Sequence, residues 1–216
     1  MLSLGAALFI VAVTQGDAGR AAQPVTTRPA ASVAADPATS GQWGTLLNWP
    51  LVAVHSALLN TGQVLTWDAW ETGGTPSVRL WNPSSQAFTA VPNQTSQIFC
   101  SAHVQLPDGR LLVVGGHNGG EYGIRDTTLF DPQTSQWSKL ANMNDARWYP
   151  SATLLGDGRV AAVSGQITPG VYADTPEMWS PGPQTWSRLT GASPYQKCFA
   201  PFNMTNQENA STRQRA

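Results

Sequence analysis

Residues 102–116 read AHVQLPDGRLLVVGG, and this stretch decides the fold. Two largely apolar runs, Ala102 to Leu106 and Arg110 to Val114, flank the turn residues Pro107-Asp108-Gly109. Asp-Gly between such runs predicts a β-hairpin, because the tight turn needs residues that adopt positive φ. Gly115-Gly116 then ends the second run. The stretch therefore predicts two antiparallel strands joined by a short turn.

A second pair of strands is expected directly after this hairpin. The runs Thr128 to Phe130 and Gln136 to Leu140 flank residues 131–135, which read Asp-Pro-Gln-Thr-Ser. Proline fixes φ and removes a hydrogen-bond donor, and Asp and Ser favour turns, so this segment predicts a second turn. Residues 98–145 are thus interpreted as one unit of four short strands.

That unit recurs along the chain with a period near 49 residues (130 − 81 = 49 and 179 − 130 = 49). Three sets of residues carry the repeat: the aromatic before each proline turn (Trp81, Phe130 and Trp179), the aromatic after it (Phe88, Trp137 and Trp186), and the hairpin glycine (Gly62, Gly109 and Gly158). A period near 50 residues predicts kelch-type propeller blades. The aromatic after each turn is expected to pack between neighbouring blades.

The expected fold is therefore all-β, a kelch-type β-propeller with about three four-stranded blades. The blades are predicted at about residues 50–95, 98–145 and 147–192. A propeller ring typically closes with roughly four to eight blades, so three blades are part of an incomplete propeller.

The composition excludes one class of partner. Among 216 residues there are 12 Lys and Arg and 13 Asp and Glu, for a net charge of −1. Since no basic stripe is present to neutralise phosphates, nucleic acid is not an expected partner. Charged residues make up only 12% of the chain, a composition common in secreted all-β proteins.

The two ends of the chain differ from its repeat region. Leu2 to Val13 is apolar, is too short to span a bilayer and resembles the core of a secretory signal, so residues 1–22 are expected to be a signal-like segment. Because no Lys or Arg precedes it, a disordered apolar N-terminus is the alternative. A Pro/Ala/Thr-rich linker is expected at 23–44, the propeller at 45–195 and a polar tail at 196–216. The interpretation is a secreted protein, extracellular or periplasmic, without a membrane span.

Cys100 and Tyr149 occupy the same register of two successive repeats. Each lies nine residues before the hairpin glycine of its unit (109 − 100 = 9 and 158 − 149 = 9). Equivalent residues on adjacent blades point at the same central region, where a thiol and a phenol can bond covalently and hold a metal. Two alternatives stay open: a disulfide between Cys100 and Cys198, and an ordinary inner-strand aromatic at Tyr149.

Four stretches carry a family resemblance: Phe99-Cys100-Ser101-Ala102, Leu106-Pro107-Asp108-Gly109-Arg110, Val113-Val114-Gly115-Gly116 and Ala146-Arg147-Trp148-Tyr149-Pro150-Ser151. Together they resemble the copper radical oxidases, the family of galactose oxidase and glyoxal oxidase. The Arg-Trp-Tyr-Pro form is closer to the glyoxal oxidase branch. The likeness covers roughly residues 45–192.

The resemblance implies a specific site. In this family the sulfur of the matching cysteine bonds to the ring of the matching tyrosine, ortho to its oxygen, and that oxygen ligates a mononuclear copper. The resemblance therefore implies that Cys100 and Tyr149 form a thioether radical cofactor, with Tyr149 as an equatorial copper ligand. It also implies a seven-bladed propeller and oxidation of a small primary alcohol, aldehyde or sugar with O2 to give H2O2. Copper(II) favours tetragonal nitrogen and oxygen ligation, into which a phenolate fits.

This chain departs from the family in two ways. The family's two histidine ligands and its axial tyrosine lie in later blades and a C-terminal domain, so one of the four protein ligands is present. The chain alone is therefore expected to be inactive. Galactose oxidase also places a tryptophan over the cross-linked tyrosine where this chain has Ile167, which cannot stack as an aromatic does.

The three histidines match no ligand position of the family. His55 lies seven residues before its hairpin glycine and His103 six (62 − 55 = 7 and 109 − 103 = 6), so the two are predicted to face opposite sides of their strands. They and His117 are expected to make hydrogen bonds within a blade. Arg147 and Trp148 are candidates for the substrate mouth, and a packing role is the alternative for Trp148.

The alternative function is a kelch propeller that binds carbohydrate or protein and has no redox chemistry. Propellers host many functions, so the fold alone does not choose between the two.

Overall fold

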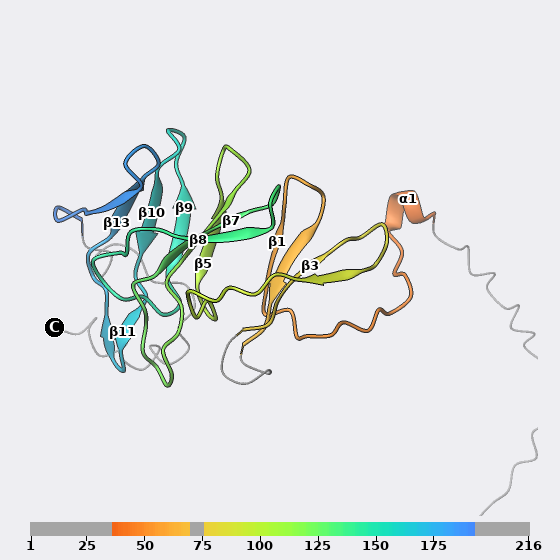
Figure 1. The fold of residues 1–216 in the computed structure, drawn as a ribbon, viewed down its shortest axis with the longest axis horizontal. Helices are drawn as coiled ribbons and strands as arrows, with labels where there is room; N and C mark the ends of the chain where they lie inside the picture. Colours follow the sequence, from red (N-terminus) through yellow and green to blue (C-terminus); the bar gives the residue numbers. More distant parts are fainter. Residues whose placement is uncertain (1–35, 70–75, 193–216) are drawn as a thin grey trace, which may run out of the picture. The chain divides into compact units, whose positions relative to one another are not determined.

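The computed structural model describes residues 36–69 and 76–192 (Figure 1). The chain divides into two units, Met1–Leu47 and Asn48–Ala216. The signal-like segment and the polar tail expected from the sequence lie outside the described residues.

The described part of the first unit holds one short helix, α1 (Pro37–Ser40). The Asp36 carboxylate accepts the backbone N–H of Ala38 over 3.0 Å, which satisfies a donor at the start of the helix. This helix falls within the stretch that the composition predicts to be a linker.

The described part of the second unit contains three four-stranded antiparallel sheets, and in each sheet the strands pair in chain order. The first sheet is β1 (His55–Leu58), β2 (Val64–Trp67), β3 (Val78–Trp81) and β4 (Phe88–Ala90); the second is β5 (Ala102–Gln105), β6 (Leu111–Val114), β7 (Thr127–Asp131) and β8 (Gln136–Lys139); the third is β9 (Ser151–Leu154), β10 (Val160–Val163), β13 (Glu177–Ser180) and β14 (Thr185–Arg188). A two-stranded ribbon, β11 (Gln166–Thr168) and β12 (Val171–Tyr172), lies between β10 and β13 in the chain. These sheets confirm the prediction of an all-β fold with three four-stranded blades of an incomplete propeller.

The hairpin between β5 and β6 forms where the sequence predicts it. Gly109 has φ +87°, and its N–H donates to the carbonyl of Leu106 over 2.9 Å. Asp108 accepts the backbone N–H of Arg110 over 3.0 Å and also pairs with the Arg110 guanidinium. The turn is thus closed by its own polar residues, which leaves both strands free to bury their apolar side chains.

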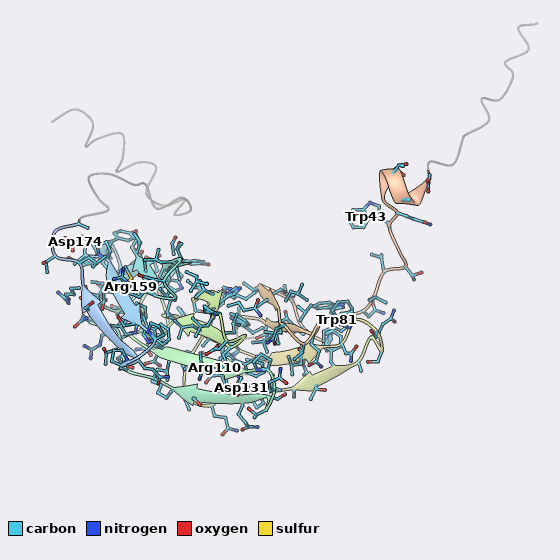
Figure 2. All side chains as sticks on the ribbon, turned by 90° about the horizontal axis from the view of Figure 1, so that it is seen from above. Trp43, Trp81, Arg110, Asp131, Arg159 and Asp174 are labelled. Atoms are coloured by element: carbon cyan, nitrogen blue, oxygen red, sulfur yellow. The ribbon has the colours of Figure 1, made fainter. Side chains whose placement is uncertain are left out.

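The third sheet repeats this arrangement at the turn before β10. Asp157 accepts the backbone N–H of Arg159 over 3.1 Å and pairs with the Arg159 guanidinium over 2.7 Å. Arg110 and Arg159, both labelled in Figure 2, each directly precede the second strand of their sheet. The repeat is therefore preserved in turn chemistry as well as in strand order.

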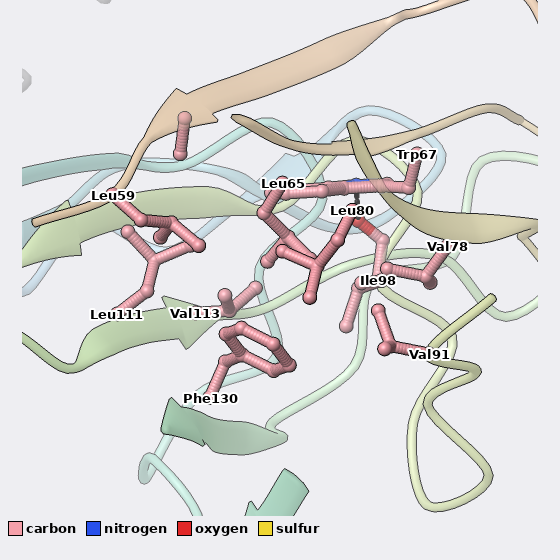
Figure 3. Packing of buried hydrophobic residues seen from close by; sticks show 11 residues of the cluster. Leu59, Leu65, Trp67, Val78, Leu80, Val91, Ile98, Leu111, Val113 and Phe130 are labelled. Atoms are coloured by element: carbon pink, nitrogen blue, oxygen red, sulfur yellow. Dashed lines mark hydrogen bonds between the residues drawn. The ribbon is translucent and has the colours of Figure 1, made fainter. Parts of the chain in front are cut away.

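A hydrophobic core joins the first sheet to the second (Figure 3). Its buried members come from both sheets and from the connection between them: Ala57, Leu59, Leu65, Trp67, Val78, Leu80, Val91, Ile98, Leu111, Val113 and Phe130. Burying a large apolar side chain of this kind contributes about 1.5–3 kcal/mol. The two sheets are therefore held together mainly by side chains that neither sheet can bury alone.

A second core joins the second sheet to the third, and tryptophans bridge both boundaries. Its buried members are Leu106, Leu112, Val114, Leu129, Met143, Val160, Ala162 and Trp179. The indole N–H of Trp137 donates to the carbonyl of Val91 over 2.9 Å, and that of Trp186 to the hydroxyl of Thr127 over 2.9 Å. Each bond crosses to the preceding sheet, as expected for these two aromatics. Phe88 packs instead against Trp49, with ring centroids 5.1 Å apart.

Candidate active site

Cys100 and Tyr149 each lie just before the first strand of a sheet. Cys100 precedes β5 and Tyr149 precedes β9, and both have φ +55°. A non-glycine residue in this left-handed region costs of order 1–3 kcal/mol and persists only where its surroundings hold it. The two residues that the repeat register singles out are therefore also two positions of backbone strain.

The structure brings these two residues together. The backbone N–H of Tyr149 donates to the carbonyl of Cys100 over 2.9 Å, and the thiol and the phenol lie near enough to shift each other's pKa. Cys100 is a free thiol with no exposed surface, while Tyr149 is 52% exposed. The sulfur is thus shielded, while the phenol remains open to solvent.

Burial governs the acidity of both groups. It raises the pKa of the Cys100 thiol to about 11, against the smaller opposing effect of the hydrogen bond with Tyr149. Burial likewise raises the pKa of the Tyr149 phenol to about 12, and the hydrogen bond with Cys100 adds to the increase. Both groups are therefore protonated at neutral pH, and the phenol must lose its proton before its oxygen can bind a cation as phenolate.

An internal ion pair supports the segment that leads into Tyr149. Arg147 and Glu177 have no exposed side-chain surface, and their charged groups lie 3.0 Å apart. Arg147 also donates to the carbonyls of Ser164 and Thr175, over 2.6 and 2.7 Å. Arg147 therefore does not line a substrate mouth, contrary to the sequence prediction. Its charge is satisfied inside the protein.

The Glu177 carboxylate extends this network. It accepts the backbone N–H groups of Asn144 and Asp145, over 2.6 and 2.9 Å, and the Asn144 side chain over 2.7 Å. Burial raises the pKa of Glu177, but the N–H groups of Asn144 and Asp145 and the guanidinium of Arg147 outweigh it, so the pKa is lowered overall. Glu177 was missed by sequence reasoning. The feature of the sequence that could have indicated it is a single carboxylate at the start of a mostly apolar strand.

Close backbone packing fixes the segment 147–149. A Cβ on Gly115 would lie 2.3 Å from the carbonyl oxygen of Arg147, so only glycine allows this approach. Trp148 exchanges two backbone hydrogen bonds with Gln166, of 2.9 and 2.8 Å. The Tyr149 backbone is therefore held by neighbours on both sides.

An aromatic ring lies against Tyr149, although the family's tryptophan position holds Ile167 in this chain. The ring centroids of Trp148 and Tyr149 are 4.7 Å apart, with the planes tilted by 53°. The His117 ring lies 5.9 Å from Trp148 and 5.6 Å from Phe99. The aromatic neighbour of the phenol thus comes from the residue beside it in the chain.

The remaining histidines meet at the boundary between the first and second sheets. Their ring centroids are 6.1 Å apart. His55 lies on β1 and His103 on β5, in adjacent sheets. Because the two side chains come from opposite faces of their strands, as predicted, their rings lie toward each other across the boundary. The prediction of hydrogen bonds within one blade is wrong for His55, because its Nε2 accepts the N–H of Cys100 from the next sheet, over 3.0 Å.

The described residues do not by themselves form a complete copper site. In residues 36–69 and 76–192 no three His, Cys, Asp or Glu side chains are grouped so as to hold a metal ion. The Tyr149 phenol is the ligand that the resemblance assigns to this part of the chain, and Tyr149 is 52% exposed.

Comparison with known proteins identifies the lineage. The Kelch motif model matches residues 99–144. Galactose oxidase of Gibberella zeae is 28% identical over 195 residues, which cover 85% of this chain and 28% of that protein. A solved structure of a fungal alcohol oxidase in complex with copper has a TM-score of 0.60 and 27% identity, covering 70% of this chain and 33% of that one. The chain is a galactose-oxidase-like kelch region.

This galactose-oxidase-like region spans less than a third of the length of that galactose oxidase. Its likeness to that enzyme and to the alcohol oxidase makes it a copper radical oxidase-like kelch domain. The kelch repeat-containing protein kel-10 of Caenorhabditis elegans is also similar, at 31% identity over 87 residues, covering 36% of this chain and 15% of that protein. Among the residues that the structure describes, no helix has the length and apolarity to cross a membrane.

Proposed function

We propose that this galactose-oxidase-like region is the N-terminal propeller portion of a secreted copper radical oxidase. The proposed enzyme oxidises a small primary alcohol, aldehyde or sugar with O2 and produces H2O2. The observation that carries the proposal is the pairing of Cys100 and Tyr149 from adjacent blades, whose backbones are joined by the bond from the Tyr149 N–H to the Cys100 carbonyl. The apolar run at Leu2 to Val13 supports secretion.

In this proposal Cys100 and Tyr149 become joined by a thioether. The S–H bond of Cys100 and one ring C–H bond of Tyr149, ortho to its oxygen, are broken, and a C–S bond is formed. The two electrons and two protons pass to O2, which becomes H2O2. The backbone bond from Tyr149 to Cys100 supports this assignment, because it keeps the two residues side by side.

Among the residues that the structure describes, Tyr149 would hold copper, which would supply the one-electron chemistry of the site. The half-exposed phenol is open to a copper ion from solvent, whereas the buried sulfur is shielded from other thiols. The remaining copper ligands would have to come from outside the described residues.

The alternative function is a kelch propeller that binds carbohydrate or protein, and the similarity to kel-10 favours this alternative.

Peptide mapping distinguishes the oxidase from the binding module. The protein expressed from its complete reading frame is loaded with copper, exposed to O2, reduced and digested. A peptide pair that joins Cys100 to Tyr149 and survives reductant supports the oxidase, since a disulfide would be cleaved.

A Cys198→Ser variant is the matched control, and it should form the same linked peptide. A free Cys100 thiol after copper and O2 treatment would favour the binding module.

A further inference from the structure

The turn that presents Cys100 is held from the first sheet at two points. Nε2 of His55 accepts the N–H of Cys100 over 3.0 Å. Nε1–H of Trp67 donates to the carbonyl of Ile98 over 3.0 Å, the bond drawn in Figure 3. One bond satisfies a donor of the turn and the other an acceptor. Both backbone groups are interior, where an unpaired N–H or C=O is costly.

The His55 ring is itself fixed in place. It stacks on Trp67 with ring centroids 4.8 Å apart and planes 13° from parallel, and the His103 ring meets it edge-on. Burial, with a smaller effect of His103, lowers the pKa of His55 to about 4. The imidazole is therefore neutral near neutral pH, and its Nε2 lone pair is available to the Cys100 N–H.

We propose that His55 is a positioning residue for Cys100: from the first sheet it holds the left-handed backbone of the turn, and so aims the thiol at the Tyr149 phenol. The hydrogen bonds run in series across three sheets. Cys100 donates to His55, and Tyr149 in turn donates to the carbonyl of Cys100. The catalytic meaning of this role rests on the proposed function, but the positioning itself does not.

His103 provides a matched comparison. It lies in the same interface, with its ring 5.1 Å from that of Trp67 and 6.1 Å from that of His55. The acceptor of the Cys100 N–H is His55 and not His103. A substitution of His103 disturbs the same packing without removing the acceptor for Cys100.

Alkylation of Cys100 by iodoacetamide tests the proposal in copper-free protein, with peptide mass spectrometry to follow that one thiol. His55→Phe keeps a stacking ring and loses the acceptor, while His55→Gln keeps an acceptor and loses the ring. Loss of the acceptor should speed alkylation at least about fivefold in His55→Phe, whereas His55→Gln and His103→Phe should stay within about twofold of wild type. The proposal would be overturned if Cys100 were alkylated as slowly in His55→Phe as in wild type. It would also be overturned if Cys100 were alkylated as fast in His103→Phe as in His55→Phe.

Nuclear magnetic resonance of the ¹⁵N-labelled wild-type protein covers the case in which His55→Phe does not fold. A hydrogen bond between two nitrogens transmits a scalar coupling. A coupling between the Cys100 amide nitrogen and His55 Nε2 supports the proposal, and its absence in a folded sample counts against it.

Thioether formation after addition of copper and O2 connects the role to the chemistry. His55→Phe should form the Cys100–Tyr149 thioether at least about fivefold more slowly than wild type, and His55→Gln should restore the rate. If wild type itself forms no thioether, the proposed function fails. Alkylation and scalar coupling then still decide the role of His55.

Discussion

Tyr149 donates its backbone N–H to the carbonyl oxygen of Cys100 over 2.9 Å, although the two residues belong to different blades. Each has φ +55°, so the same strained conformation occurs twice at equivalent positions. Such strain is retained when the surrounding contacts over-determine it, and it is often found at functional sites. The predictions below test the contacts that hold this pair and the blades around it.

Replacing Tyr149 by Phe should prevent the thioether without unfolding the protein. The phenol oxygen is what activates the ring, and the half-exposed hydroxyl contributes little to stability. The free energy of unfolding in urea should change by no more than about 1 kcal/mol. Tyr122→Phe, at another half-exposed tyrosine, is the control and should leave the linked peptide intact. A thioether in the Tyr149→Phe protein would refute the assignment.

Replacing Arg147 by Met should destabilise the protein strongly. The change leaves the Glu177 carboxylate buried without its cation. Breaking a buried ion pair from one side costs about 3–5 kcal/mol, measured by urea unfolding. Arg110→Met removes a more exposed ion pair and should cost far less. Equal losses in the two variants would contradict the structural role of the buried pair.

Replacing Gly115 by Ala should cost more than the same change at Gly62. Both glycines have positive φ, of +72° and +79°, so each variant loses about 1–2 kcal/mol to backbone strain. A Cβ on Gly115 would also lie 2.3 Å from the backbone carbonyl oxygen of Arg147, whereas a Cβ on Gly62 meets nothing within 4 Å. Thermal unfolding of wild type and the two variants measures the difference, and equal losses would contradict the close packing of residues 147–149 on Gly115.

Stability should fall as the pH drops from about 6.5 to about 4. The pKa of His55 is lowered to about 4 in the folded protein from 6.5, so in this range the unfolded chain binds the proton and the folded chain does not. The proton therefore favours unfolding, by roughly 3 kcal/mol at most from His55. His103, whose pKa is also lowered, acts in the same direction. His55→Gln should lose less stability than wild type over this range, and parallel curves would contradict the prediction.

The chain of 216 residues loaded with copper should release no H2O2 from alcohols, aldehydes or sugars. His55 and His103 are engaged between sheets, and His117 hydrogen-bonds to the carbonyl of Gly120. Tyr149 alone would hold copper weakly and leave it open to water. A peroxidase-coupled assay checks this, and sustained peroxide release would show a ligand set that the described residues do not contain.

The strands and turns of this protein could be predicted from the sequence because the chain is built from a repeat. Local turn chemistry, such as Asp108-Gly109, needs only neighbours in the chain, and a 49-residue period places the same strand in the same part of each blade. The same regularity put Cys100 and Tyr149 at one register. The family likeness then assigned chemistry to that pair, which geometry alone does not do.

Contacts between blades were decided only by the tertiary structure. The bond from Cys100 to His55 and the edge-on contact of the His55 and His103 rings depend on which strand faces meet and how closely. A period along the sequence specifies where a residue lies within its own blade. It carries no information about the side chain that the next blade presents, because that depends on packing between sheets that are distant in the chain.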